Sequence, residues 1–113
     1  MLLGEYSLPM PADALAALAE PSRRRIVDRL GTSERSVGEL VEALGMSQPA
    51  VSKHLKVLRE AGLVSCRTAA QRRIYRIDPA PLRELDEWLE PYRRLWTRHL
   101  DALERHLDDQ EER

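Results

Sequence analysis

Serine, glutamine and lysine side chains recur along one face of residues 47–59, and their functional groups are those that bind DNA. A Gln amide can form two hydrogen bonds with adenine, a Lys ammonium can donate to guanine, and hydroxyl groups can donate to phosphate oxygens. The candidates for base contact are Gln48 and Ser52, for base or phosphate contact Lys53, and for backbone contact Ser47 and Lys56. The plainer alternative is a helix face that only meets solvent.

A second set of candidates lies in two β-capable runs, 63–68 and 72–77, joined by Ala69-Ala70-Gln71. The pattern predicts a β-hairpin, whose register stays open because the turn lacks an Asn-Gly or Asp-Gly pair. Arg side chains in general favour narrow, strongly negative minor grooves, and the alternative for this hairpin is phosphate contact without base reading. Tyr75 is expected to pack in the core. The candidate DNA contacts of the hairpin are Arg67, Gln71, Arg72 and Arg73.

The first set of candidates needs a helix-turn-helix to display it, and residues 36–45 predict the first helix of one. Ser36 and Glu39 form a capping box that begins the helix, and Gly45 provides the residue of positive φ that ends it. Its apolar residues recur at helical spacing on one face. They are Val37, Leu40, Val41 and Leu44.

Residues 47–62 predict the second helix, after a very short turn. Ser47 can cap this helix, Pro49 falls in its first turn, and Gly62 ends it. Its apolar stripe faces away from the polar candidates, which suits insertion of the polar face into a major groove. The stripe is Val51, Leu55 and Leu58, with Ala50 and Ala61 beside it.

The segment 47–64 resembles the recognition helix of the ArsR/SmtB family of winged helix-turn-helix repressors from bacteria and archaea. The family pattern is S-Q-x-x-(V/I)-S-x-H-L-x-x-L-x-x-A-G-L-V. It is matched by Ser47, Gln48, Val51, Ser52, His54, Leu55, Leu58, Ala61, Gly62, Leu63 and Val64. The resemblance extends more loosely from about residue 15 to about residue 107, and so covers most of the chain. It implies an apolar contact of Pro49 with the groove, and a place for His54 at the edge of the turn or against phosphate.

The segments on either side of this region predict further helices. Asp13 can cap a short apolar helix over 14–19, and Pro21 opens the next one, which ends near 31–32. From Pro79 onward, apolar residues alternate steps of three and four, and Pro91 should kink or restart that helix near Glu90. A stripe this wide can pack on its own domain and on a partner chain. The expected dimer contacts are Leu15, Leu18, Leu85, Leu89, Tyr92, Trp96, His99 and Leu103.

Length and charge fit a single DNA-binding domain. The 113 residues carry a net charge of minus 1, but residues 21–77 hold 12 Lys/Arg against 5 Asp/Glu. A basic middle between acidic ends suits a face that meets phosphate. The chain lacks an apolar run long enough for a membrane span and a signal peptide, which predicts a cytoplasmic protein without membrane contact. We expect a flexible arm at 1–12, a winged helix-turn-helix domain with C-terminal dimerisation helices at 13–108, and a frayed tail at 109–113.

The metal sites of the resembled family are incomplete in this chain. Where the arsenic-type site has C-V-C-D-L-C, residues 36–41 read SVGELV, without a thiolate. Of the C-terminal family site, D-x-H and then H-x-x-(E/H), only the fragments His99, Asp101, His106 and Asp109 are present. We predict no metal and no cofactor. The single cysteine, Cys66, is expected to be a small buried strand residue, with a redox sensor as the alternative.

The sequence thus predicts a mainly α fold with a small β-hairpin, a winged helix-turn-helix that is dimeric through its terminal helices. The predicted function is a homodimeric, sequence-specific repressor of transcription on a pseudo-palindromic operator in double-stranded DNA, with its effector unknown. No catalytic constellation can be assembled, so an enzyme is not expected. One alternative is an interaction module whose C-terminal helices bind a protein or a ligand against Trp88, Tyr92 and Trp96. The other is a metal-responsive repressor with a degenerate His/Asp site.

Overall fold

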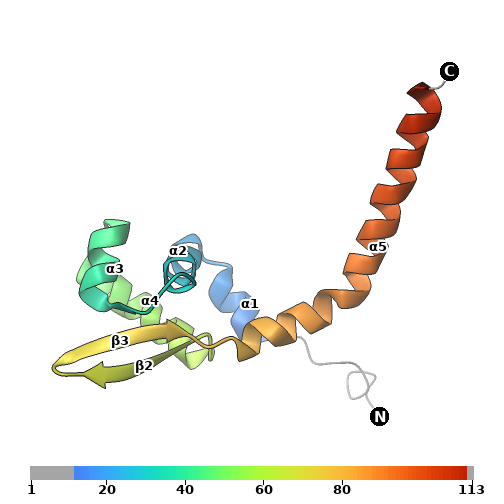
Figure 1. The fold of residues 1–113 in the computed structure, drawn as a ribbon. Helices are drawn as coiled ribbons and strands as arrows, with labels where there is room; N and C mark the ends of the chain where they lie inside the picture. The colour runs from blue at the N-terminus through green and yellow to red at the C-terminus, as the bar shows by residue number, and fades with distance from the viewer. Residues whose placement is uncertain (1–11, 112–113) are drawn as a thin grey trace, which may run out of the picture.

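The computed structural model describes residues 12–111, and Figure 1 shows their arrangement. The short helices and a small sheet form one packed unit, from which a long C-terminal helix projects (Figure 1). In chain order the elements are α1 (Ala12–Leu18), α2 (Pro21–Leu30), β1 (Arg35–Ser36), α3 (Val37–Leu44), α4 (Gln48–Glu60), β2 (Val64–Ala69), β3 (Arg72–Ile77) and α5 (Ala80–Glu111). The predicted fold class, mainly helical with a small β-hairpin, is confirmed.

An aliphatic core joins α2, α3, α4 and the sheet. Tyr75 from β3 is buried with it, as expected. Burial of one large aliphatic side chain stabilises the fold by about 1.5–3 kcal/mol. Because α3 and α4 both contribute such side chains to the core, the core fixes the angle between these two helices. Its largest fully buried side chains are Ile26, Leu40, Leu55, Leu58, Leu63 and Val51.

The predicted signals of the helix-turn-helix are confirmed in detail. The Glu39 backbone N–H donates to Ser36 Oγ at 3.2 Å, and the Ser36 N–H donates to Glu39 Oε1 at 3.0 Å. Gly45 ends α3 in the left-handed region, with φ of 65°. Ser47 Oγ then caps α4 by accepting from the Ala50 N–H at 3.3 Å. Gly45 and its neighbour therefore turn the chain directly from one helix into the next.

The sheet has three antiparallel strands in the order β1-β3-β2. Strand β1 was not predicted, because a run of two residues is too short to show a period of two. The expected three-residue turn over 69–71 is wrong. Ala69 pairs with Arg72, so the turn is Ala70 and Gln71, and Ala70 takes a φ of 58°. This tight turn keeps the hairpin, or wing, extended to its tip.

Helix α1 packs on the core through Ala14 and Ala17, and arginines of α2 satisfy its free carbonyl groups. Arg23 Nε donates to Ala17 O at 2.6 Å, and Arg24 Nη1 donates to Leu18 O at 2.9 Å. The helix begins at Ala12, so Asp13 lies in its first turn and not at its cap. The rest of the expected N-terminal arm, residues 1–11, lies outside the described residues.

Helix α5 is one uninterrupted helix of 32 residues. Its axis changes direction partway along (Figure 1), and Pro91 lies inside the helix without interrupting it. Residues 109–111, which were expected to belong to a frayed tail, are included in α5. These residues are helical because neither Gly nor Pro follows Pro91 to end the helix.

Most of α5 extends away from the packed unit. The radius of gyration is 19.6 Å, whereas a compact domain of this length has about 13 Å. Leu82, near the start of α5, packs against the core, and none of the residues of α5 is fully buried. Among residues 12–111, no helix is long and apolar enough to cross a membrane.

Candidate nucleic-acid interface

The N-terminal half of α4 presents the polar face that the sequence predicted. The core holds the opposite face of the helix through Val51, Leu55 and Leu58. The Ser47 hydroxyl is engaged as the helix cap, which fixes the start of α4 and leaves its hydrogen free to donate. The exposed predicted contacts on this helix and its cap are Ser47, Gln48, Pro49, Ser52, Lys53 and Lys56.

His54 does not share that exposed face. Its Nε2 lies 3.8 Å from Glu20 Oε2, and its side chain is 19% exposed. Its Nδ1 is buried without a hydrogen-bond partner. Partial desolvation raises the pKa of Glu20, but hydrogen bonds from the backbone N–H groups of Ser22 and Arg23 lower it, and the net pKa is below its usual value. His54 therefore contacts the start of α2, and the structure does not bring it to the proposed DNA face.

Some arginines of the wing pair with other side chains of the protein, and others do not. Arg67 pairs with Glu34, and its Nη2 lies 2.9 Å from Glu34 Oε2. Arg72 Nη2 donates to Ser36 Oγ at 2.7 Å and lies 3.1 Å from Glu39 Oε1. Two of the predicted DNA contacts thus have partners on other elements of the chain. Arg73 and Gln71 are exposed on β3 and at the turn.

A cleft of about 420 Å³ lies between α4 and the wing. Three cations reach it, Lys56 and Arg59 from α4 and Arg73 from β3, and no carboxylate lines it. Its full lining is Val37, Gln48, Ser52, Lys56, Arg59, Arg73 and Tyr75. Arg59 was missed as a site residue, although its spacing of seven from Ser52 places both on one side of the helix. The cleft brings the predicted base-reading residues together with cations of α4 and β3.

The other chemical candidates do not assemble into a site. Among residues 12–111, no three His, Cys, Asp or Glu side chains come together as metal ligands. Cys66 is half-buried on β2 and pairs across the sheet with Tyr75. The Trp88 and Tyr92 rings lie against each other, with centroids 5.1 Å apart, while Trp96 is 65% exposed.

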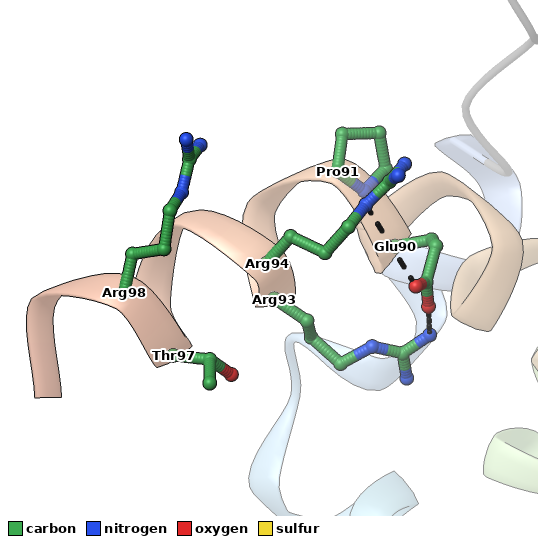
Figure 2. A pocket seen from close by; sticks show the side chains of 6 residues that line it. All are labelled: Glu90, Pro91, Arg93, Arg94, Thr97 and Arg98. Carbon is green, nitrogen blue, oxygen red and sulfur yellow. Dashed lines mark hydrogen bonds and ion pairs between the residues drawn. The ribbon is translucent and has the colours of Figure 1, made fainter. Parts of the chain in front are cut away.

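The hollow of about 710 Å³ on α5 does not contain these aromatic rings. Figure 2 shows its lining residues, in which Glu90 pairs with Arg93 and Arg94. Arg93 also pairs with Asp86. The remaining lining residues are Pro91, Thr97 and Arg98. The hollow is a different place from the aromatic ligand pocket that the sequence suggested as an alternative.

The fold and the polar face of α4 define a winged helix-turn-helix DNA-binding protein. Residues 20–65 match the family model for "Bacterial regulatory protein, arsR family". Over 100 residues the chain is 45% identical to the HTH-type transcriptional regulator Rv2034 of Mycobacterium tuberculosis. This match covers 88% of this chain and 91% of that protein. It is also 44% identical over 70 residues to the HTH-type transcriptional repressor SmtB of that species, with 62% of this chain and 52% of the repressor covered.

A solved structure of an ArsR-like regulator has a similar fold. The ArsR-like transcriptional regulator from Rhodococcus sp. RHA1 superposes with a TM-score of 0.69 at 31% identity, over 91% of this chain and 95% of that one. The chain therefore belongs to the ArsR family. It is a DNA-binding transcriptional regulator, and its family is one of regulators and not of enzymes.

Proposed function

We propose that the chain acts as a homodimeric repressor that binds a pseudo-palindromic operator. The observation that carries this proposal is the unpartnered apolar stripe along α5. Its seven large apolar residues are between 36% and 65% exposed, and a contiguous exposed apolar surface of this kind marks an interaction site. The stripe consists of Leu89, Tyr92, Leu95, Trp96, Leu100, Leu103 and Leu107.

The spacing of this stripe favours a second helix of the same kind as its partner. Leu85, Leu89, Tyr92, Trp96, His99 and Leu103 alternate steps of four and three, the repeat by which two helices pack along a common seam. Pairing two α5 helices about a two-fold axis buries the same stripe on both chains. Leu15 and Leu18 of α1 are half-buried in the single chain, so part of each remains for the same interface.

The dimer would present two α4 helices to successive major grooves, about 34 Å apart along the DNA. In this proposal Gln48 and Ser52 read bases, Pro49 makes an apolar contact, and Lys53 reaches a base or a phosphate. Ser47, Lys56, Gln71 and Arg73 contact the backbone. Occupied half-sites would exclude RNA polymerase, which is repression by occlusion. A protein that binds an operator in chromosomal DNA would act in the cytoplasm.

The operator can be found by sequencing genomic fragments that the purified protein retains, and then tested with point variants. Gln48→Ala and Ser52→Ala should each cost roughly 1–3 kcal/mol on the best operator and reduce discrimination at one position. Lys56→Ala should weaken binding to all sequences about equally, because phosphates carry no sequence information. Fluorescence anisotropy on operator and scrambled duplexes measures both effects. Equal losses on both duplexes for all three variants would show that these residues do not read bases.

A further inference from the structure

His54 is a half-buried residue of α4, the helix that is proposed to read bases. Its Nε2 faces Glu20 Oε2 at 3.8 Å, and its Nδ1 is buried without a hydrogen-bond partner. Among residues 12–111, no other side chain has a buried polar atom that lacks a partner. Such atoms are rare in folded proteins, because they lose their bonds with water and gain none in return. This ring nitrogen therefore carries a cost that the rest of the described chain avoids.

Helix α2 holds the partner of His54 in place. Glu20 is the N-cap of α2, and its Oε2 accepts from the Arg23 backbone N–H at 3.1 Å. Partial desolvation raises the pKa of Glu20, but hydrogen bonds from the backbone N–H groups of Ser22 and Arg23 outweigh it, so the pKa stays below 4.5. Glu20 is therefore a fixed negative charge near neutral pH. A histidine changes its charge between about pH 5 and about pH 8, so His54 is the member of the pair whose charge changes in that range.

The other charged groups near this turn of α4 are not partners of His54. Arg23 and Arg25 of α2 donate to backbone carbonyl oxygens near the ends of α1 and α3. The remaining charged residues of α1 and of the adjoining turns of α4 are Asp13, Lys53, Lys56, Arg59 and Glu60. Within residues 12–111, Glu20 is the one side chain that lies within ion-pair distance of His54.

Protonation of His54 has two opposite effects at this place. The imidazolium gains attraction to the Glu20 carboxylate. Its second N–H, at Nδ1, would then be a buried donor of a charged group without an acceptor, which is costly. The neutral ring avoids this cost, because it can keep its proton on Nε2, toward Glu20, and leave Nδ1 as a bare acceptor. The position of α4 described here therefore suits a neutral His54, and a charged His54 requires the ring and its helix to shift.

We propose that His54 is a positioning residue for operator recognition, which holds α4 against the start of α2 while it is neutral and releases that position when it is protonated. The proposal rests on the proposed function, because it concerns the helix that would read the operator. A shift of α4 moves Gln48 and Ser52 relative to the base edges. Hydrogen bonds to bases depend steeply on distance and angle, so acid should weaken binding to the operator more than binding to scrambled DNA.

The pH profile of DNA binding tests this role. From about pH 8 to about pH 5.5, the affinity of the wild type for the operator should fall on the order of tenfold for each copy of His54, because each proton released on binding changes the affinity about tenfold per pH unit. Its affinity for scrambled DNA should change little. His54→Gln keeps an N–H that can face Glu20 but cannot titrate, and should bind the operator with a flat profile. His106→Gln is the matched control, because His106 is exposed on α5, and should keep the wild-type profile.

Proton release gives a second measurement of the same coupling. Isothermal titration calorimetry of operator binding at about pH 6, in buffers of different ionisation enthalpy, should show more proton release by the wild type than by His54→Gln. Glu20→Gln keeps an oxygen that can cap α2 but removes the fixed charge. The midpoint of its pH profile should lie below that of the wild type, because the imidazolium loses its attraction to the carboxylate. Circular dichroism without DNA checks that each variant keeps the fold across the pH range.

A profile of His54→Gln that runs parallel to that of the wild type overturns the proposal, because a histidine with only a structural role would change binding by the same factor at every pH. Operator affinity that rises in acid also overturns it. If His54→Gln does not fold, Glu20→Gln decides, and an unchanged midpoint overturns the proposal. If the wild type prefers no operator at any pH, the proposed function fails. If the wild type binds an operator tightly with a flat pH profile, only this inference fails.

Discussion

Arg72 on β3 donates from Nη2 to Ser36 Oγ at 2.7 Å, across 36 residues of sequence, and so fastens the wing to the first residue of the helix-turn-helix. Ser36 is also the cap of α3 and the partner of Ile74 in the strand pair β1–β3. One buried serine therefore connects the helix cap, the sheet and the wing. The angle between α3 and the wing depends on this connection.

Arg72→Ala should therefore lower stability, and its effect on DNA should be secondary. The lost hydrogen bond to Ser36 is expected to cost about 1 kcal/mol. Arg73→Ala is the matched control on the same strand, because Arg73 has no such contact among the described residues. Urea denaturation should separate the two, with Arg72→Ala less stable and Arg73→Ala unchanged. Equal stability of both variants would contradict a bracing role for Arg72.

The same capping box predicts a dependence of stability on pH. Hydrogen bonds from the Ser36 backbone N–H and then from its hydroxyl, with smaller effects of Arg72 and Arg35, hold the pKa of Glu39 below its usual value of 4.5. A lowered pKa means that the ionised form stabilises the fold above pH 4.5. This contribution is lost as the pH falls through the folded-state pKa.

The test is the melting temperature of wild type and Glu39→Gln between about pH 3 and about pH 7. Near neutral pH the wild type should have a higher melting temperature than Glu39→Gln, and the difference between the two melting temperatures should shrink in acid. Glu42→Gln, on the same helix, is the control, because Glu42 forms no hydrogen bond with its side chain among residues 12–111. A difference for Glu39→Gln that stays constant with pH would show that its charge is not the cause.

Two glycines of α3 and its cap should respond to alanine in opposite directions. Gly45 has a φ of 65°, and a Cβ at this position would meet no atom within 4 Å, so Gly45→Ala introduces only backbone strain, of roughly 1–2 kcal/mol. Gly38 lies inside the helix, where a Cβ would stand 3.9 Å from Ser36 Oγ. Gly38→Ala should stabilise by about 0.4–1 kcal/mol. Thermal unfolding of both variants measures the contrast, and a loss for both would mean that α3 cannot accept a side chain at either place.

The helix-turn-helix could be predicted from sequence because its signals are local. The Ser36–Glu39 box, Gly45 and the Ser47 cap each act within four residues, and the structure confirms all of them. The half-buried position of His54 could also be predicted from its spacing in the sequence. His54 follows Val51 by three residues and precedes Leu58 by four, the spacing of one helix face, which agrees with its half-buried position beside the core stripe.

The engagement of the wing arginines could not be predicted in this way. Arg67 and its partner Glu34 are 33 residues apart, and strand β1, which brings these segments together, is two residues long. Which arginines of the wing have a partner within the chain therefore depends on tertiary pairing. The sequence located the basic half of the chain, and only the structure distinguishes Arg73 from Arg67 and Arg72.

The dimer is tested most directly at Trp96, which lies in the middle of the exposed stripe of α5. Its side chain is 65% exposed in the single chain, so Trp96→Glu should leave the monomer folded. Across a two-fold interface the new carboxylate would be buried near its own copy, which is strongly unfavourable. We expect a folded monomer that loses operator binding, since one α4 helix alone presents too few contacts for a tight complex. Leu103→Glu should behave in the same way.

Thr97→Glu is the matched control for Trp96→Glu, because it adds the same charge one residue away, beside Arg93, Arg94 and Arg98 (Figure 2). Helical geometry places Thr97 off the apolar stripe, so this variant should remain dimeric and bind the operator. Sedimentation equilibrium at micromolar concentration measures the mass of each protein, and footprinting shows whether one or two half-sites are protected. If the wild type is a monomer that protects a single half-site, the α5 stripe must serve another partner, and repression by a two-fold dimer is ruled out.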